Sequence, residues 1–145
     1  MIIRPATLAD ADAIRRCAAA AYQKYIERIG REPAPMVADF EAQIRQAKVH
    51  VMCAGETLCG FAVCYAADDC YFLENIAVSP DCQSCGYGSK LLDYVHTLAS
   101  PFELVRLYTN EKMVENLQWY RKQGYMETTR RVEDGFARVY FEKRL

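Results

Sequence analysis

The sequence predicts a mixed α/β (α+β) fold, a single sheet flanked by helices. Short runs rich in β-branched and aromatic residues alternate with segments whose apolar residues recur at helical spacing. Near the middle, a strand, a glycine-rich loop and a helix follow one another, as in a strand–helix–strand crossover. No repeat or linker divides the 145 residues, so we expect one domain over residues 1–145.

The first third of the chain predicts one strand and two helices. Residues 2–4 form a short strand, and Thr7 with Asp10 three positions later is typical of a capping box. The first helix is expected to bury one stripe of residues: Ile14, Cys17, Ala18, Ala21 and Tyr25. Gly30 and two prolines end this helix, and helical spacing predicts a second one over residues 36–47.

The rest of the chain predicts the sheet and its crossover. Antiparallel strands joined by short polar turns are expected over residues 49–54, 58–66 and 70–78. The elements expected after them are a helix through 91–98, a strand over 104–109, a helix over 114–122 and strands over 125–132 and 137–141. The predicted order is therefore β-α-α-β-β-β-α-β-α-β-β.

Composition weighs against several classes of partner. The 18 basic and 19 acidic residues give a net charge of -1, so we expect no nucleic-acid partner. No apolar run is long enough to span a membrane, and the N-terminus does not have the pattern of a signal peptide. Seven cysteines, an odd number scattered among apolar residues, indicate reduced thiols in the cytoplasm. His50 and His96 lie outside zinc-finger spacing, so no metal is expected.

The loop after residues 70–78 has the composition of an anion site. Its sequence is Gln83-Ser84-Cys85-Gly86-Tyr87-Gly88-Ser89-Lys90, between a predicted strand and a predicted helix. Glycines let the backbone approach a ligand closely, and a helix N-terminus directs free N–H groups and a partial positive charge at it. A diphosphate is the natural ligand, although a plain tight turn at a helix start is the simpler interpretation of two glycines alone.

This Q-x-x-G-x-G loop, preceded by the segment 73–80 (LENIAVSP), resembles the acetyl-CoA motif of the GNAT N-acetyltransferases. The segment 107–110 (LYTN), followed by Glu115-Asn116, Trp119-Tyr120 and Gly124-Tyr125, resembles that family's second motif, an N-x-x-x-Y helix that ends in G-[FY]. Residues 3–7 with Asp10 resemble the usual start of the family. The resemblance therefore covers nearly the whole chain and says nothing about the acceptor.

The resemblance implies acetyl-CoA as the acyl donor and assigns residues to it. The backbone of Ile76, Ala77 and Val78 would pair with the pantetheine arm, at a splay between two parallel strands, and Asn116 would bond near its end. The pyrophosphate would be held by Gln83 and by the N–H groups of the loop residues Ser84, Cys85, Gly86, Tyr87, Gly88 and Ser89. Lys90 could compensate for Cys85, which replaces a residue that is often basic in the family.

Two residues are candidates for proton transfer. The resemblance implies that Tyr120 protonates the departing thiolate, a step that a neutral tyrosine hydroxyl can perform. Without the resemblance, the simpler interpretation of Tyr120 is a half-buried aromatic residue of a helix. Glu74 is expected to point to the same face of its strand as Ile76 and Val78, and not to the face of Leu73. A carboxylate among apolar residues suggests either a base for the attacking amine or an ion pair with Arg or Lys. Water is the alternative base.

Cys82 and Cys85 have the C-x-x-C spacing of thioredoxin-like proteins before a predicted helix, where a thiol pKa is lowered. The strand order of that fold is not predicted, and coincidence is the simplest explanation. Our hypothesis is that oxidation of either thiol distorts the loop and weakens cofactor binding.

The predicted function is acetyl-CoA-dependent N-acetylation by direct transfer to a primary amine of a small molecule or peptide. The resemblance places the acceptor beneath the segment 22–40, whose aromatic and acidic residues would suit an amine cation: Tyr22, Tyr25, Glu27, Glu32, Met36, Asp39 and Phe40. One alternative is a non-catalytic acyl-CoA-binding sensor, and another is transfer to a macromolecule such as a protein N-terminus or a tRNA. The sequence is compatible with a homodimer.

Overall fold

The computed structural model describes residues 1–83 and 85–145. Within them, one sheet has the strand order β1-β2-β3-β4-β5-β7-β6, in which only β4 and β5 are parallel neighbours. The strands are β1 (Ile2–Pro5), β2 (Val49–Ala54), β3 (Thr57–Ala66), β4 (Tyr71–Val78), β5 (Leu104–Asn110), β6 (Met126–Glu133) and β7 (Phe136–Arg144). This mixed α/β architecture confirms the predicted fold class.

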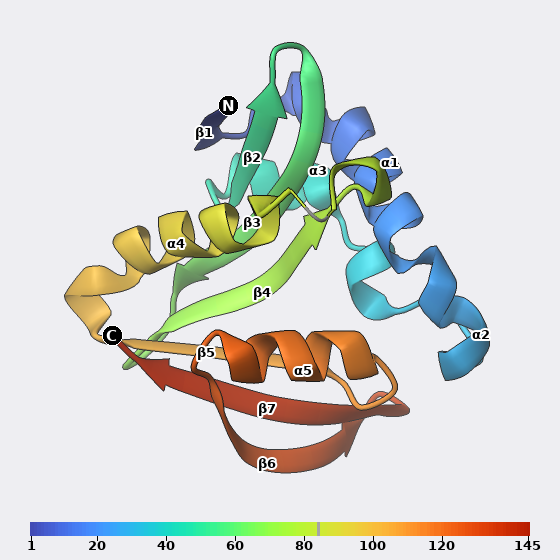
Figure 1. Ribbon diagram of the computed structural model, residues 1–145, viewed down its shortest axis with the longest axis vertical. Helices are drawn as coiled ribbons and strands as arrows, with labels where there is room; N and C mark the ends of the chain where they lie inside the picture. The colour runs from blue at the N-terminus through green and yellow to red at the C-terminus, as the bar shows by residue number, and fades with distance from the viewer. Residues whose placement is uncertain (84) are drawn as a thin grey trace.

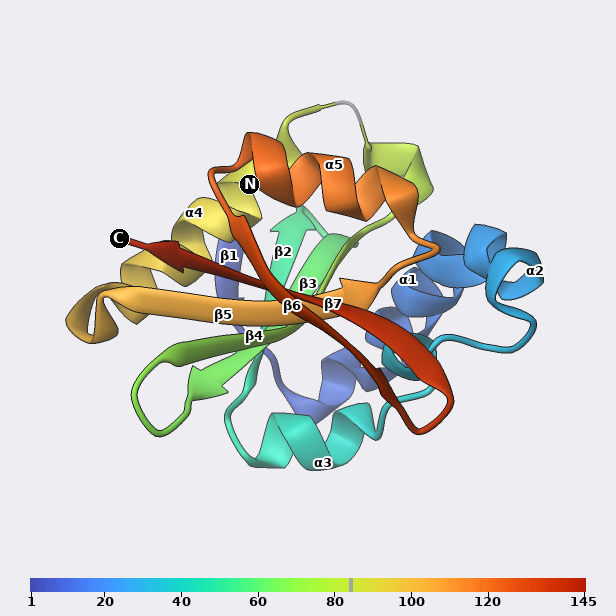
Figure 2. The same cartoon turned by 90° about the horizontal axis from the view of Figure 1, so that it is seen from below.

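Helices cover the two faces of the sheet. They are α1 (Ala11–Tyr22), α2 (Ile26–Ile29), α3 (Phe40–Arg45), α4 (Tyr87–Ala99) and α5 (Val114–Lys122). The first three lie on one face and α4 and α5 on the other (Figures 1 and 2). Each layer has its own buried cluster: one joins α1 and α3 to β2 and β3, and the other joins α4 and α5 to β4, β5 and β7. The site described below lies where the two layers meet.

The segment between α1 and β2 differs from the prediction. A short additional helix, α2, ends at Gly30, whose φ of +87° is the left-handed conformation that glycine adopts without strain. The next α-helix was expected from residue 36 but begins at Phe40. Asp39 causes this later start, because its side chain accepts a hydrogen bond from the N–H of Ala42 at 3.1 Å and so caps the helix. The predicted capping box of Thr7 and Asp10 is confirmed.

The parallel strands β4 and β5 separate halfway along their length. They are paired only between Tyr71–Leu73 and Val105–Leu107. Figure 1 shows the two strands close at one end and apart at the other, where α4 and α5 begin. Antiparallel pairing of β4 with β3 continues to Val78, so the second half of β4 keeps one partner strand and lacks the other.

A β-bulge at Glu74 marks the point of separation. Val63 pairs with Asn75 and Cys64 with Leu73, which leaves Glu74 as the extra residue on β4. Glu74 therefore points toward α3, while Ile76 and Val78 pack against the cluster that contains Leu73 and α4. The expectation that Glu74 shares a face with Ile76 and Val78 is wrong, because one inserted residue reverses the alternation of a strand.

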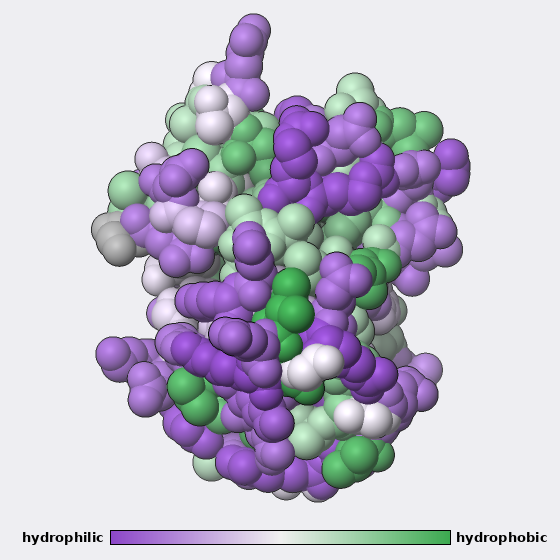
Figure 3. All heavy atoms as spheres, turned by 90° about the vertical axis from the view of Figure 1, so that its right-hand side faces the viewer, coloured by the Kyte–Doolittle hydropathy of each residue, from purple (hydrophilic) through white to green (hydrophobic). Residues whose placement is uncertain are grey.

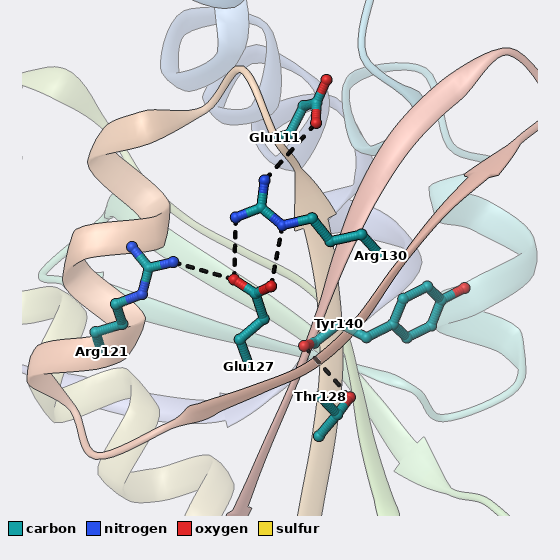
Figure 4. A network of polar contacts seen from close by, with 6 residues as sticks. All are labelled: Glu111, Arg121, Glu127, Thr128, Arg130 and Tyr140. Carbon is teal, nitrogen blue, oxygen red and sulfur yellow. Dashed lines mark hydrogen bonds and ion pairs between the residues drawn. The ribbon is translucent and has the colours of Figure 1, made fainter.

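The edge strand β6 is tied to its surroundings by charged side chains. Glu127 accepts hydrogen bonds from Arg130 at 3.0 Å and from Arg121 on α5 at 3.2 Å, and Arg130 lies 3.9 Å from Glu111 (Figure 4). Thr128, at a second bulge, donates to the carbonyl of Tyr140 on β7. Exposed ion pairs contribute little each, ~0–1 kcal/mol, but together they hold β6 against α5.

Gly60 allows β3 and β4 to approach closely. A Cβ at this position would lie 2.8 Å from the carbonyl oxygen of Ala77 on β4, which is closer than Cβ atoms pack. We expect Gly60→Ala to lower the free energy of unfolding by about 1–3 kcal/mol, measured by urea denaturation, because the two strands must move apart. Gly55→Asn is the control: this turn position has φ +60° with open space around it, and asparagine tolerates that conformation. Equal stability of the Gly60→Ala protein and the wild type would contradict the prediction.

Candidate active site

The backbone of Ile76 and Val78 faces the gap between β4 and β5. The N–H of Ser79 donates to the carbonyl of Cys59 on β3, at 2.8 Å, so alternate residues 76 and 78 direct their backbone groups to the opposite side. On that side, the carbonyl groups of Ile76 and Val78 accept hydrogen bonds from side chains of other segments. The Tyr22 hydroxyl lies 3.0 Å from the oxygen of Ile76, and the Gln83 amide donates to that of Val78 at 3.0 Å. The gap thus offers peptide groups of a strand edge to a ligand.

A groove runs from this gap to the N-terminus of α4. Gly86, with φ +74°, turns the chain into the helix, and a Cβ at Gly88 would lie 3.4 Å from the Trp119 ring. The groove has a volume of about 420 Å³. Its walls are Ala21, Tyr22, Lys24, Tyr25, Ile76, Ala77, Val78, Gln83, Gly86, Tyr87, Gly88, Ser89, Glu115, Asn116 and Trp119. Helix N–H groups and backbone turned by glycine suit a phosphate group here.

Most of the residues assigned to acetyl-CoA therefore line one groove. Cys85 and Lys90 are exposed and are not among its walls. The Lys90 ammonium group lies 5.8 Å from the centre of the Tyr87 ring. Ser84, predicted to belong to the same set, lies outside the described residues. The binding roles stay predictions, and the geometry brings together the groups that they require.

Sequence reasoning did not identify Lys24 and Trp119 as walls of the groove. Lys24 follows α1 and is the one cationic side chain among the described walls. Glu115, also in the wall, forms a 2.7 Å ion pair with Arg28, and the hydrogen bond from Arg28 lowers the pKa of Glu115 to about 2. Lys24 therefore places a positive charge at the groove, whereas the loop itself has the neutral Cys85 at the position discussed above. No motif indicated Lys24, because this residue lies in the short helical turn Gln23–Tyr25, about 60 residues before the loop.

A second, smaller cavity lies beyond the gap, with a volume of about 110 Å³. It shares Tyr22, Ile76 and Asn116 with the groove, so the two meet at these residues. Its other walls are Pro33, Ala34, Pro35, Ala38, Leu73, Glu74, Asn75, Tyr108, Thr109, Asn110, Met113, Tyr120, Phe136 and Arg138. On the side of the molecule where α1 and α2 lie, Figure 3 shows hydrophobic side chains reaching the surface between hydrophilic ones.

Glu74 reaches this cavity from the bulge of β4. Its carboxylate accepts hydrogen bonds from the Gln43 amide at 2.5 Å and from the Tyr65 hydroxyl at 3.0 Å. Among the ion pairs of the described residues none involves Glu74, so the alternative of a structural pair with Arg or Lys is not observed. Two neutral donors hold the carboxylate in position at the wall of the cavity.

Tyr120 on α5 is another wall of the cavity and is only 6% exposed. Its ring packs against Trp119, Tyr125 and Phe141, at centroid distances of 5.1, 5.7 and 5.9 Å. Burial raises the pKa of the Tyr120 hydroxyl above its ordinary value near 10. The group therefore keeps its proton at neutral pH, as a proton donor must. Glu74 and Tyr120 lie on two different walls of one cavity.

Asn75 is a buried polar residue that the predictions passed over. It is 4% exposed, its Oδ1 lies 2.6 Å from the Tyr22 hydroxyl, and its Nδ2 donates to the carbonyl of Pro35 at 3.1 Å. These contacts join α1, the proline segment and β4 around the gap. An asparagine within an apolar strand was the available signal, since buried amides need partners. Asn116, predicted near the pantetheine end, donates to the sulfur of Met113 at 3.6 Å.

The segment 22–40 contributes differently from the expectation. Tyr22 lines both spaces and Tyr25 lines the groove, but the acidic residues predicted to attract an amine are absent from the walls: Glu27, Glu32 and Asp39. Asp39 caps α3, while Phe40 is buried in the core and Met36 packs beside it. An acceptor role for these three acidic residues stays a prediction, and neither of the two described spaces supports it. Acidic residues at helix ends and in turns are more often solvated than turned into a cavity.

All seven cysteines are free thiols. Cys85 is exposed, whereas the Cys82 thiol lies against Cys59 on β3, and its hydrogen bond to the Cys59 sulfur raises the pKa of Cys82 to about 11. Cys82 therefore carries little of the reactive thiolate at neutral pH, and the C-x-x-C spacing does not produce a low-pKa thiol at this position.

The oxidation hypothesis can be tested with Cys85. We expect peroxide treatment to lower acetyl-CoA affinity, measured by titration calorimetry, because Cys85 is exposed in the loop that adjoins the groove. Cys85→Ser should protect the protein, while Cys70→Ser, far from the groove, should not. Unchanged affinity after peroxide treatment would reject the hypothesis.

No group of three His, Cys, Asp or Glu side chains in residues 1–83 and 85–145 is placed to hold a metal ion. No helix in the same part of the chain is long and apolar enough to cross a membrane.

Comparison with known proteins places this geometry among acetyltransferases. The profile of a family described as "Acetyltransferase (GNAT) domain" matches residues 45–127. The PaiA N-acetyltransferase of Thermoplasma acidophilum, solved in complex with coenzyme A, matches with a TM-score of 0.79 and 15% identity over 99% of this chain and 98% of that one. A GNAT-family acetyltransferase from Bacillus cereus ATCC 10987 matches with a TM-score of 0.74 and 19% identity, over 99% of this chain and 96% of that one.

A third structure is the ribosomal-protein-alanine N-acetyltransferase of Brucella melitensis. Its TM-score is 0.72 at 18% identity, and the match covers 100% of both chains. Likenesses at such low identity establish the fold and leave the acceptor undetermined. A sequence comparison with curated proteins finds no significant match.

Proposed function

The chain belongs to the GNAT acetyltransferase family, and on that premise we propose that it transfers the acetyl group of acetyl-CoA directly to a primary amine of a small molecule or peptide. The enzyme is an acyltransferase. The observation that carries the finer proposal is the junction of two spaces at the β4–β5 gap. A groove with helix N–H groups leads to it from one side, and a cavity with a carboxylate and a buried phenol leads to it from the other.

Acetyl-CoA, the acyl donor, would bind in the groove. The N–H groups at the start of α4, from Gly86 to Ser89, would hold the pyrophosphate, and Lys24 would add a positive charge. Backbone groups of Ile76 and Val78 would pair with the amides of the pantetheine arm, displacing Tyr22 and Gln83 from the carbonyls. Bound acetyl-CoA supplies an acetyl group activated as a thioester.

The two proton transfers of the reaction would take place in the smaller cavity, where Glu74 and Tyr120 are walls. A primary amine is mostly protonated near neutral pH and must lose its proton before its nitrogen can bond to the acetyl carbon. Glu74, held by Gln43 and Tyr65, would take that proton. As the carbon–sulfur bond breaks, the Tyr120 hydroxyl would donate its proton to the sulfur, and the second proton that the nitrogen loses on becoming an amide would return through solvent to Tyr120. A backbone N–H in the Ile76–Val78 segment would stabilise the charge that develops on the acetyl oxygen.

The proposal is tested by incubating the protein with acetyl-CoA and a panel of primary amines. Mass spectrometry of the acetylated amine is the appropriate readout, because the seven cysteines of the protein interfere with thiol reagents. Multiple turnovers with at least one amine are expected. Tight acetyl-CoA binding without acetylation of any amine or peptide would instead favour a binding or sensing role. We propose the cytoplasm as the location, since all seven thiols are free.

A further inference from the structure

We propose that the cavity accepts an amine that also carries a carboxylate several bonds away, with Arg138 as the residue that binds the carboxylate. This inference rests on the function proposed above, because the acceptor amine is taken to enter the same cavity. It goes further by naming the chemical class of the acceptor, an amino acid whose reacting amine and carboxylate are well separated.

The cavity has one charge of each sign. Among its described walls, Glu74 and Arg138 are the only charged side chains, and no ion pair joins them. Glu74 lies on β4 and Arg138 on β7, with β5 between the two strands. Both charges act on the hydroxyl of Tyr108, which lies on β5: Arg138 lowers its pKa and Glu74 raises it, although burial is the largest influence and raises it. A ligand with both an ammonium and a carboxylate complements this wall.

Arg138 is held in place but has few partners. Its side chain is 13% exposed, and the guanidinium lies 4.3 Å from the centre of the Tyr108 ring and 5.8 Å from that of Phe136. Stacking on aromatic rings fixes the plane of a guanidinium and leaves its edges free.

The one ion pair of Arg138 among the described residues is a 3.6 Å contact with Glu133, which also accepts a hydrogen bond from the Tyr140 hydroxyl. A guanidinium has five N–H donors, and a planar carboxylate accepts two of them side by side. Arg138 therefore has donors available toward the cavity.

A second arginine strengthens the attraction for an anion. Arg131 on β6 is directly opposite Arg138 in the register of β6 and β7. Like charges opposite each other on neighbouring strands repel; Glu133, whose pKa is lowered by the hydrogen bond from Tyr140 and by both arginines, offsets part of this repulsion, and an anion bound in the cavity would offset more. Arg131 is exposed, so its contribution is weaker than that of Arg138.

Sheet geometry sets the distance between the two ligand groups. Two regular strand spacings would give roughly 10 Å, but β4 separates from β5 at Glu74 and Arg138 pairs with Asn110 beyond the paired stretch, so the two backbones lie farther apart than that. The small cavity admits the narrow chain of an ω-amino acid, or the side chain of a lysine-like molecule, with its amine near Glu74 and its carboxylate near Arg138.

The test compares matched acceptors, the ω-amino acids from 3-aminopropanoate to 6-aminohexanoate and their neutral carboxamides. We expect kcat/KM to be at least about tenfold higher for the best acid than for its amide, because one charge-assisted bidentate contact is lost in the amide. Equal kcat/KM for acid and amide in the wild type would overturn the inference. So would a tenfold preference for an aminoalkyl phosphate over the acid of equal length.

Variants assign the preference to Arg138. Arg138→Gln should abolish the difference between acid and amide by lowering kcat/KM for the acid alone. Arg138→Lys should retain part of the difference between acid and amide, because lysine keeps the positive charge but cannot bind a carboxylate through two parallel N–H groups. Arg144→Gln is the control, an exposed arginine at the end of the same strand. An equal loss for acid and amide in Arg138→Gln would instead indicate a structural role and reject the inference.

Failure of the proposed function would be distinguishable from failure of this inference. If no amine is acetylated, the affinity of the same acid–amide pairs for the protein saturated with CoA decides the question by calorimetry. Tighter binding of the acid that is lost in Arg138→Gln would support the carboxylate site. Equal or absent binding of both members would overturn it.

Discussion

Tyr120→Phe is expected to lower kcat at least about tenfold while acetyl-CoA still binds. The variant loses only a hydroxyl, and the phenyl ring can keep its contacts with Trp119, Tyr125 and Phe141. Without that proton donor, the thiolate must leave unprotonated or take a proton from water. Turnover is measured as acetylated amine per enzyme, and affinity by calorimetry. Full retained activity would reject the assigned role.

Tyr125→Phe is the matched control for Tyr120→Phe. Tyr125 belongs to the same aromatic cluster, and its hydroxyl is bonded to His96 at 2.7 Å rather than directed to the cavity. Loss of this hydroxyl is expected to change stability slightly and kcat by less than about twofold. If both variants lost activity equally, the common cause would be packing of α5 and not proton donation.

Glu74→Gln is expected to lower kcat by about 10²-fold at neutral pH, because general base catalysis contributes ~10²–10⁴-fold. Glutamine has the same shape and can still bond to Tyr65 and Gln43, so KM for acetyl-CoA should not change. Glu56→Gln, in the exposed turn between β2 and β3, is the control. A variant with wild-type kcat would assign deprotonation of the amine to water.

The pH dependence of the same variant separates a lost base from a distorted site. Raising the pH increases the fraction of neutral amine by about tenfold per unit below the pKa of the amine. The rate of Glu74→Gln should rise in proportion, whereas the wild-type rate should rise less steeply. A variant that is inactive at every pH would have lost the geometry of the cavity. Tyr65→Phe, which removes one donor to Glu74, is expected to show a smaller loss.

The sequence predicted the strands and the two long C-terminal helices well, because their periodicity is strong and their ends carry clear signals. The strand over residues 49–54 and the helix over 114–122 agree with β2 and α5 to the residue. The segment between α1 and β2 was harder to predict. Its elements are short, and the start of α3 depends on whether Asp39 caps the helix, a choice that tertiary packing makes.

The candidate site was predictable where a motif is contiguous and not where packing assembles it. One contiguous stretch of sequence supplies the groove walls Ile76, Ala77, Val78, Gln83, Gly86, Tyr87 and Gly88, and their binding roles stay predictions. The orientation of Glu74 depends on a bulge that alternation alone cannot predict. Lys24 and Arg138 reach the site through contacts between distant segments, and each is a common residue type without a motif.

The separation of β4 from β5 also has a consequence for stability. Half of β4 has an edge inside the molecule that no strand pairs with, so we expect the N–H groups of Ile76 and Val78 to exchange with water more readily than those of a central strand. A cosubstrate lying along this edge would act as the missing strand. Saturating CoA should therefore raise Tm, because it binds only the folded state, and should slow amide hydrogen exchange chiefly at Ile76 and Val78.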